Sequence, residues 1–366
     1  MRILIDAHVF DGKFQGSRTY ILGIYNAMLD LREEWEFYFA AQDTEALKEA
    51  FGTKPNAHFI KLSTGNKYRR LLFEFPKLIK KHQIDYTHFQ YITPLLKKGK
   101  YMVTTHDILF EEARFESYFP KKYRFLNGKL FRRSAKKADI LFTVSDYSKQ
   151  KIHEYYGIPK MNIYVTPNAV TLHDDTENAS SYVSKKFGCS KFLLYVSRIE
   201  PRKNHIAVLR AFVALQLQKA GYQLVCVGNR DIAYPEMDSF IEENKQIFEE
   251  SLKYFSGISD EDLKHFYAAS EVVLYPSFAE GFGIPPLEGA MFRKAVICSS
   301  ATAMSEFDFF PYHIDPNNQK ELEEAIKATL SGTSYPINDI KDIVEKRYNW
   351  NRSAEVLAQA IEADTR

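Results

Sequence analysis

Two carboxylates, Glu280 and Glu288, frame a Gly-Phe-Gly turn at residues 281–283. Glycines let a backbone approach a ligand closely, and the free N–H groups of a helix that starts after such a turn favour a negative charge such as a phosphate. A carboxylate would repel that phosphate, but it accepts hydrogen bonds from a sugar diol. The combination therefore predicts a ligand that carries both phosphates and diols, which is the chemistry of a nucleotide sugar.

A second group of charged residues follows the apolar run at 191–196, where Arg198, Arg202 and Lys203 lie within six residues. A guanidinium can grip a diphosphate with two hydrogen bonds, while a lysine ammonium acts as a point charge. Cations placed there would stabilise a departing nucleoside diphosphate. The alternative is an ordinary solvated basic loop.

A histidine, His106, comes directly after a predicted strand at residues 101–105. In open α/β sheets, ligands bind at the edge where the carboxyl ends of the strands meet. A histidine at this edge can hydrogen-bond a sugar hydroxyl, and a neighbouring carbonyl can stabilise positive charge that develops at the anomeric carbon. The alternative is a structural histidine with satisfied hydrogen bonds.

The elements that must position these residues are strands that alternate with helices. Apolar, β-rich runs separated by helical patterns are typical of a parallel α/β sheet. We expect strands at residues 2–6, 36–40, 57–60, 85–89, 101–105, 139–144, 191–196, 223–227, 271–275 and 295–298. Pro285 and Pro286 predict that a helix starts directly after the glycine turn, with Glu288 in its first turn.

The length of 366 residues is large for one hydrophobic core and fits two domains. A polar stretch at residues 171–179 follows a Pro-Asn turn and marks a change of composition. We therefore expect an N-terminal Rossmann-like domain at 1–168, a second one at 169–347, and a last helix within 348–366.

The composition is that of a soluble globular protein, with 45% hydrophobic and 26% charged residues. The three cysteines, Cys189, Cys226 and Cys298, form no metal-ligand or disulfide pattern, which predicts buried thiols in a reducing compartment. No signal peptide is recognised, and no run approaches the ~20 apolar residues of a membrane span. These features predict a cytoplasmic protein.

Positive charge is concentrated between residues 61 and 137, where the chain has 19 Lys and Arg but 6 Asp and Glu. In segments 67–81 and 121–137 the basic residues alternate with Phe, Leu and Tyr. Such segments can rest peripherally on the anionic inner face of a membrane, or they can be the solvated faces of two core-packing helices. No nucleic-acid-binding motif accompanies the charge, so no nucleic-acid partner is expected.

The pair Glu280 and Glu288, with Gly-Phe-Gly-Ile-Pro-Pro-Leu between them, resembles the signature of the retaining glycosyltransferases of family 4 (glycosyltransferase group 1). The spacing of Arg198 and Lys203 resembles that family's pair on the donor diphosphate. A loop at residues 11–19 is similar to the family's N-terminal glycine loop, although Gln-Gly replaces the usual glycine doublet.

The resemblance implies the α/β GT-B fold, in which two Rossmann-like domains have a cleft between them. The C-terminal domain would bind the nucleotide sugar and the N-terminal domain would face the acceptor. The last helix, which starts near Trp350, would cross back onto the N-terminal domain.

The resemblance also implies a role for each candidate. Arg198 and Lys203 would neutralise the leaving diphosphate, and Glu288 would hold the ribose diol. Glu280 would hold hydroxyls of the transferred sugar, and His106 would orient that sugar. Further donor contacts are expected from Gly16, Arg18, Ile258, Gly281, Phe282, Gly283 and Leu287. No cofactor and no metal are expected, because the cations supply the positive charge and no Asp-X-Asp pair stands in a suitable place.

The predicted function is transfer of a hexose from a nucleoside-diphosphate sugar to a saccharide or lipid-linked saccharide in surface-polysaccharide synthesis. The opening residues and the length are similar to bacterial mannosyltransferases, so GDP-mannose is the expected donor. Two other hypotheses are a GT-B nucleotide-sugar epimerase, which needs no acceptor, and a non-enzymatic protein that binds membranes or nucleic acid.

Overall fold

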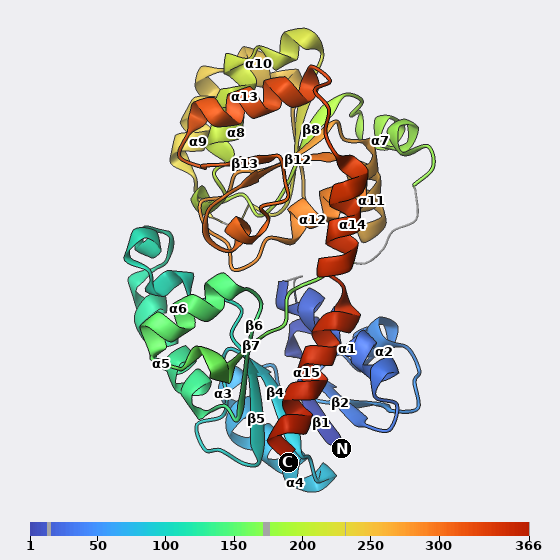
Figure 1. Cartoon of the computed structure of the whole chain (residues 1–366), viewed down its shortest axis with the longest axis vertical. Coiled ribbons are helices and arrows are strands. Elements are labelled where there is room, and N and C mark those ends of the chain that lie inside the picture. The colour runs from blue at the N-terminus through green and yellow to red at the C-terminus, as the bar shows by residue number, and fades with distance from the viewer. Residues whose placement is uncertain (13–15, 171–175, 231, 366) are drawn as a thin grey trace. The chain divides into compact units, whose positions relative to one another are not determined.

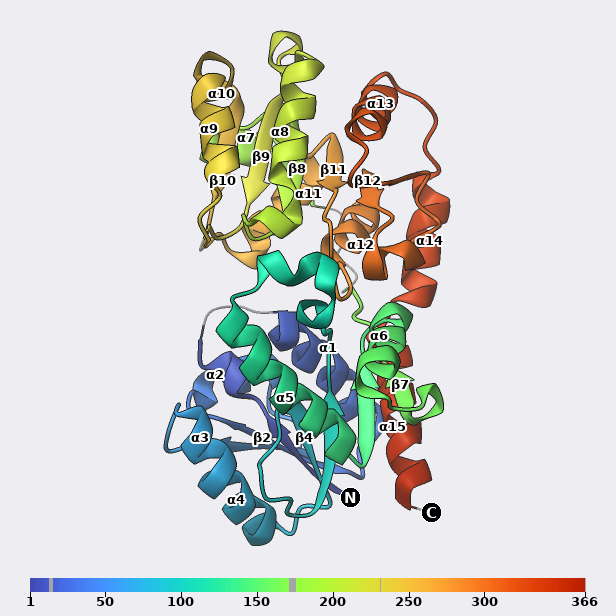
Figure 2. The same ribbon diagram turned by 90° about the vertical axis from the view of Figure 1, so that its left-hand side faces the viewer.

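The computed structural model describes residues 1–12, 16–170, 176–230 and 232–365 (Figures 1 and 2). The chain divides into two compact units. The first unit consists of Met1–Thr171 and Tyr348–Arg366, and the second consists of Leu172–Arg347. The first division falls after Thr171, whereas the sequence predicted it after residue 168.

The first unit is built on a seven-stranded parallel sheet with the order β3-β2-β1-β4-β5-β6-β7. Its strands are β1 (Arg2–Asp6), β2 (Glu36–Ala41), β3 (Ala57–Lys61), β4 (Tyr86–Gln90), β5 (Lys100–Thr104), β6 (Ile140–Thr143) and β7 (Ile163–Val165). Helices cover both faces of a parallel sheet, so its strands are apolar on both sides. This explains why six of the seven strands, β1 to β6, could be located from continuous apolar runs.

Helices cover the two faces of this sheet in two groups (Figures 1 and 2). The helical segments of the first unit are α1 (Gly16–Leu31), α2 (Thr44–Phe51), α3 (Lys67–Arg69), a π-helical turn (Arg70–Glu74), α4 (Phe75–His82), α5 (Lys121–Lys137), α6 (Asp146–Tyr156) and α15 (Trp350–Thr365). Successive strand residues point to opposite faces. Phe89 accordingly belongs to the same core cluster as Phe75 of α4. Its neighbour His88 points to the opposite face, where its Nδ1 forms a hydrogen bond with Tyr25 OH of α1.

Proline and capping residues set two helix boundaries in the first unit. Pro76 lies in the first turn of α4 and marks a second helix start after the π-helical turn. Ser145 caps α6 by accepting a hydrogen bond from the N–H of Ser148.

The last helix, α15, belongs to the first unit and packs against α1 (Figure 1). The Trp350 ring lies so close to Gly23 that a Cβ atom there would be 2.0 Å from Trp350 Cε2. The ring also meets the Tyr20 ring edge-on, with 6.3 Å between the ring centres. From the same helix, Ser353 Oγ donates a hydrogen bond to the carbonyl of Pro167 at 2.8 Å. The absence of a side chain at Gly23 therefore makes room for the tryptophan.

The second unit is built on a six-stranded parallel sheet with the order β10-β9-β8-β11-β12-β13. Its strands are β8 (Phe192–Val196), β9 (Gln223–Val227), β10 (Leu252–Phe255), β11 (Val272–Tyr275), β12 (Ala295–Ser299) and β13 (Tyr312–Ile314). Its α-helices are α7 (Ala179–Phe187), α8 (His205–Ala214), α9 (Pro235–Glu243), α10 (Lys245–Ser251), α11 (Asp260–Ala269), α12 (Ile284–Met291), α13 (Gln319–Leu330) and α14 (Ile337–Arg347). The short edge strand β13 was not predicted, because three residues show no periodicity.

Each sheet has a point at which the strand order reverses, and ligands bind there in open α/β sheets. In the second unit this point lies between β8 and β11, which are paired. In the first unit it lies between β1 and β4. The loops that follow β8 and β11 carry the charged motifs found in the sequence, so the topology brings these two motifs together.

Candidate active site

The loops that follow β8 and β11 are joined by hydrogen bonds. The N–H of Phe278 donates to the carbonyl of Arg202 at 2.9 Å. The side-chain amide of Asn204 donates to the carbonyls of Pro276 at 3.1 Å and Pro316 at 3.0 Å. The basic segment and the glutamate motif are therefore held in register at the switch point, although about 80 residues separate them along the chain.

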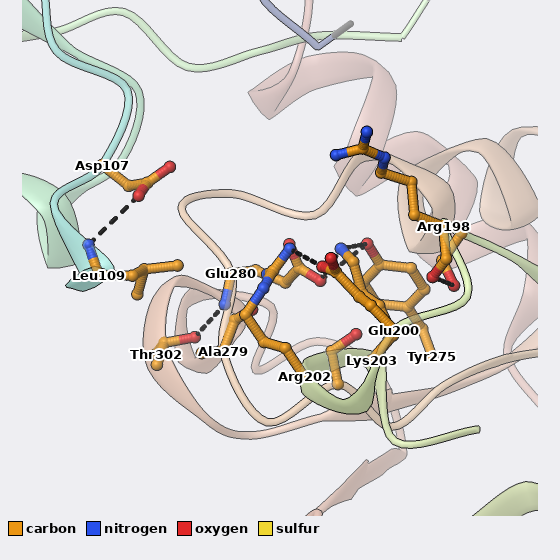
Figure 3. Close-up of polar contacts among 12 residues, drawn as sticks. Asp107, Leu109, Arg198, Glu200, Arg202, Lys203, Tyr275, Ala279, Glu280 and Thr302 are labelled. Carbon is orange, nitrogen blue, oxygen red and sulfur yellow. Dashed lines mark hydrogen bonds and ion pairs between the residues drawn. The ribbon is translucent and has the colours of Figure 1, made fainter. Parts of the chain in front are cut away.

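Glu280 lies at the centre of a buried charged cluster (Figure 3). Lys203 Nζ donates to Glu280 Oε1, and Tyr275 OH donates to the same oxygen at 3.1 Å. Arg202 Nη1 donates to Glu280 Oε2 at 3.2 Å. Lys203 and Glu280 are each only 7% exposed, so the ion pair is almost removed from solvent.

The charge state of Glu280 follows from these contacts. Burial alone would raise its pKa, but the Lys203 ammonium and the Arg202 guanidinium lower the pKa to about 2. The N–H of Glu280 also donates to Thr302 Oγ1 at 2.9 Å, which fixes the backbone (Figure 3). Glu280 is therefore an ionised carboxylate at neutral pH, and its remaining lone pairs can accept hydrogen bonds from sugar hydroxyls.

Arg202 is a member of this cluster that the sequence analysis did not select. Its Nη2 donates to Glu200 Oε1 at 2.5 Å, and its Nη1 donates to the carbonyl of Ala279 as well as to Glu280. Arg198 is exposed, and Figure 3 draws its guanidinium above the cluster, apart from Glu280. Arg202 could have been found from the sequence, because it is one of the three cations after residue 196. The Arg–Lys spacing typical of the family favoured Arg198 instead.

The glycine turn and helix α12 have the predicted order, with one difference. Gly283 has φ +101°, and a Cβ atom there would lie 3.2 Å from Met304 Cγ, so this position requires glycine. Prolines occupy the first positions of α12. Glu288 is the fifth residue of α12, so the prediction that it lies in the first turn is wrong: the helix already begins at Ile284.

Glu288 is held by one hydrogen bond, which its Oε2 accepts from Tyr267 OH at 2.6 Å. Burial raises the pKa of Glu288, the Tyr267 hydroxyl opposes this shift, and Asp260 adds to it. Glu280 and Glu288 therefore belong to one strand–turn–helix segment, which runs from β11 into α12.

His106, in the first unit, is buried at the carboxyl end of β5. Its Nε2 is 2.7 Å from Gln90 Oε1. The Tyr20 ring meets the imidazole edge-on, with 5.0 Å between the ring centres. Burial lowers the pKa of His106 to about 3. The imidazole is therefore neutral at physiological pH, and when Nε2 carries the proton that Gln90 accepts, Nδ1 is left as an acceptor.

The other predicted donor contacts are divided between the units. Gly16 is the first residue of α1, and the Arg18 guanidinium lies 4.9 Å from the centre of the Phe10 ring, both in the first unit. Gln15 of the same loop lies outside the described residues. The second unit contains Ile258, which is half-buried between β10 and the Ser259 cap of α11, together with Gly281, Phe282, Gly283 and Leu287.

Within the four described ranges, no group of three His, Cys, Asp or Glu side chains could hold a metal ion. Cys189, Cys226 and Cys298 are buried free thiols, and burial raises the pKa of each.

Family models match both halves of the chain in order. Residues 14–174 match the model described as "Glycosyltransferase Family 4", and residues 178–355 match "Glycosyl transferases group 1". Together the two models cover most of the chain.

Among curated proteins, the chain is 30% identical over 258 residues to O-antigen chain mannosyltransferase B of Escherichia coli, covering 68% of this chain and 66% of that relative. It is 27% identical over 239 residues to O-antigen chain mannosyltransferase RfbU of Salmonella typhimurium, covering 64% of this chain and 61% of that protein. It is 23% identical to serotype-specific mannosyltransferase WbdA of Escherichia coli, of which it covers 32%. The chain thus spans less than two thirds of the length of the relatives it matches.

Solved glycosyltransferase structures share the fold. Sucrose-phosphate synthase from Thermosynechococcus elongatus has a TM-score of 0.75 at 17% identity, with 99% of this chain and 98% of that chain covered. Anabaena Alr3699/HepE in complex with UDP and glucose has a TM-score of 0.72 at 16% identity, with 99% and 100% covered. The fold prediction is confirmed, and this chain belongs to the family 4, group 1 glycosyltransferases and has their GT-B fold.

Proposed function

We propose that the protein transfers a hexose from a nucleoside-diphosphate sugar to a saccharide or lipid-linked saccharide during surface-polysaccharide synthesis. The observation that carries this proposal is the buried cluster of Glu280, Lys203 and Arg202 beside the Gly283 turn, at the switch point of the second sheet. The names of the mannosyltransferase relatives favour mannose as the sugar, and GDP-mannose is the donor that we propose for it.

The proposed reaction retains the configuration of the anomeric carbon. The acceptor oxygen forms a bond to this carbon while the bond from the carbon to the diphosphate oxygen breaks on the same face. The leaving phosphate takes the proton of the acceptor hydroxyl, so the protein supplies no nucleophile. Lys203 and Arg202 stabilise the negative charge that develops on the diphosphate, with Arg198 as a further cation at the loop.

The remaining groups hold the donor. Glu280 accepts hydrogen bonds from hydroxyls of the transferred sugar, and His106, which is neutral, orients this sugar. Glu288 accepts hydrogen bonds from the ribose diol. The proposal requires neither a metal nor a cofactor, because side-chain cations neutralise the leaving group.

A thermal-shift titration with GDP, UDP, ADP and their sugar conjugates tests the donor site. A ligand at 100 times its Kd adds about 2.7 kcal/mol to stability. We expect one nucleotide to raise the melting temperature and Glu288→Gln to reduce that shift, because the ribose loses a charged acceptor worth about 1.5–3 kcal/mol.

Glu261→Gln, which changes an exposed glutamate in α11, is the matched control and should bind the nucleotide as the wild type does. A nucleotide shift that is equal in Glu288→Gln and Glu261→Gln would contradict the role of Glu288. If no nucleotide raised the melting temperature, the transferase proposal would fail in favour of a binding protein.

We also propose that the first unit docks peripherally on the inner face of an anionic membrane. None of the described helices is long and apolar enough to cross a membrane. Most of the exposed large hydrophobic side chains of the described residues lie instead in the basic part of the chain: Tyr68, Leu72, Phe73, Leu95, Leu96, Tyr123, Phe125 and Leu126. We call these residues the apolar docking group.

The docking group lies on segments that cover the same face of the first sheet. Ile92 packs against both the core cluster that contains Phe75 of α4 and the cluster that contains Phe131 of α5. Arg133 of α5 donates a hydrogen bond to the carbonyl of Pro94 at 3.2 Å, which ties the loop before Leu95 to the helix. Exposed apolar side chains surrounded by lysines are typical of a membrane-interface surface.

A vesicle-binding assay tests this surface. Changing Lys121, Lys122 and Lys129, all exposed on α5, to Glu should weaken binding to vesicles that contain phosphatidylglycerol by more than about a hundredfold, since each basic residue near such a surface contributes ~1 kcal/mol. The same three changes at Lys219, Lys245 and Lys264 give an equal change of net charge elsewhere and should leave binding nearly unchanged. Equal loss in both triple variants would show a non-specific charge effect and refute the surface.

A further inference from the structure

A second polar cluster lies at the switch point of the first sheet and is used by none of the roles above. Asp6 is the last residue of β1, next to β4, and is only 2% exposed. Its Oδ1 is 2.8 Å from His8 Nδ1 and 3.5 Å from Arg70 Nε. Arg70 comes from the π-helical turn at Arg70–Glu74, and such turns are frequent at functional sites.

One buried donor of this cluster, Arg70 Nε, has no hydrogen-bond partner within the part of the chain that the structure describes. The Arg70 side chain is only 6% exposed, yet its Nε makes no hydrogen bond, and its single ion pair is the 3.5 Å contact with Asp6. The contacts of Asp6 with His8 and Arg70 all use Oδ1, which leaves Oδ2 free to accept. His8, whose side chain is one third exposed, uses only Nδ1.

Buried polar groups in folded proteins are nearly always hydrogen-bonded, so the unmet Arg70 Nε donor requires an explanation. A carboxylate oxygen that can accept lies beside a guanidinium that can donate. The neutral imidazole of His8 offers Nε2 as a further acceptor, because its Nδ1 already donates to Asp6. A hydroxyl both donates and accepts, so a vicinal diol satisfies both sides at once. An anionic ligand matches the cluster less well, because the Asp6 carboxylate would repel it.

The electrostatics support an ionised Asp6. Burial alone would raise its pKa, but His8 and Arg70 lower the pKa overall. The charges of Asp6 and Arg70 therefore offset each other, which leaves a polar and nearly neutral site. Such a site favours an uncharged saccharide over a phosphate or a uronic acid.

We propose that Asp6, His8 and Arg70 form a subsite that binds vicinal hydroxyls of a neutral hexose in the acceptor. The inference rests on the proposed transferase function, because it assigns the acceptor class to the first unit. It adds that recognition of this sugar uses a carboxylate–guanidinium pair carried by β1 and the π-helical turn. In a transferase, this subsite would select the acceptor sugar without touching the donor diphosphate.

Saturation-transfer NMR on the full chain tests the subsite with methyl α-mannoside, methyl α-glucoside and sodium glucuronate as probes. We expect the wild type to bind a neutral methyl glycoside. The double variant Asp6→Asn/Arg70→Gln, which removes both charges together, should lose at least about tenfold in affinity, the effect of one hydrogen bond to a charged group. His8→Ala should lower the affinity by a smaller factor.

Arg210→Gln is the matched control, since Arg210 is a half-exposed arginine of α8 that pairs with Glu236, and it should bind the glycoside as the wild type does. Unchanged melting temperatures in His8→Ala would exclude unfolding as the cause of its loss. The inference is overturned if no neutral glycoside binds the wild type, if both subsite variants bind as the control does, or if glucuronate binds more tightly than the glycosides.

The donor titration separates this inference from the proposed function. Glycoside binding that depends on Arg70, in a protein that no nucleotide stabilises, would support the subsite while the transferase proposal fails. A nucleotide shift together with glycoside binding that is independent of Asp6, His8 and Arg70 would support the transferase and overturn the subsite.

Discussion

Replacing Lys203 with methionine should destabilise the protein by about 3 kcal/mol and lower turnover of a nucleotide sugar by at least about a hundredfold. The stability loss arises because Glu280, which is 7% exposed, loses one of its two cationic partners while it stays buried. Arg202 still pairs with Glu280, so the loss falls at the lower end of the range for a broken buried ion pair. The loss of turnover arises because the leaving diphosphate loses a cation.

A double-mutant cycle with Lys203→Met and Glu280→Gln measures the interaction in isolation. If the side chains are coupled as the structure indicates, the double variant should lose less unfolding free energy than the two single variants lose together. The difference should be about 1–3 kcal/mol. Urea titration, combined with hydrogen exchange of peptides that cover β8 and β11, reports the free energy of unfolding and its location. Lys245→Met, on an exposed lysine of α10, is the control. Additive losses would contradict the pairing.

Stability towards acid should depend on Glu280. The pKa of this carboxyl is lowered from 4.5 to about 2 in the folded protein, so folding favours the ionised form. Its contribution is fully present above about pH 4.5 and is lost as the pH falls towards 2, because the unfolded chain binds the proton first. A shift of this size corresponds to about 3 kcal/mol.

Urea unfolding of the wild type and of Glu280→Gln at several pH values between 7 and 2.5 tests this expectation. The stability difference between the two proteins should shrink as the pH falls, since glutamine cannot titrate. Other carboxylates, Asp6 among them, are present in both proteins and cancel in the comparison. Glu355→Gln, on an exposed face of α15, should follow the wild-type curve. A pH-independent difference for Glu280→Gln would show that Glu280 is not an ionised member of the cluster.

Local features of the sequence determined the strands, the helix starts and the position of the glycine turn. Apolar runs located the central strands of both sheets to within one or two residues, because helices bury both faces of a parallel sheet and each strand becomes continuously apolar. The prolines after Gly283 marked a helix start through short-range steric effects. The glutamate motif also identified the family.

The partners of the charged groups were decided only by the tertiary structure. Glu280 is paired with Lys203 and Arg202 because β8 lies beside β11, a neighbour relation that strand periodicity does not encode. The choice between Arg198 and Arg202 depends on the path of the loop after β8, which leaves Arg198 exposed and turns Arg202 towards Glu280 (Figure 3).

The Asp6, His8 and Arg70 cluster illustrates the same limit. Each residue is unremarkable in the sequence, and Arg70 was counted only as part of a basic helix. The fold brings Arg70 to the end of β1 from more than 60 residues away, through a π-helical turn that no sequence pattern predicted. Periodicity and capping act within a few residues, so they determine the elements, whereas burial and charge pairing depend on which strands become neighbours.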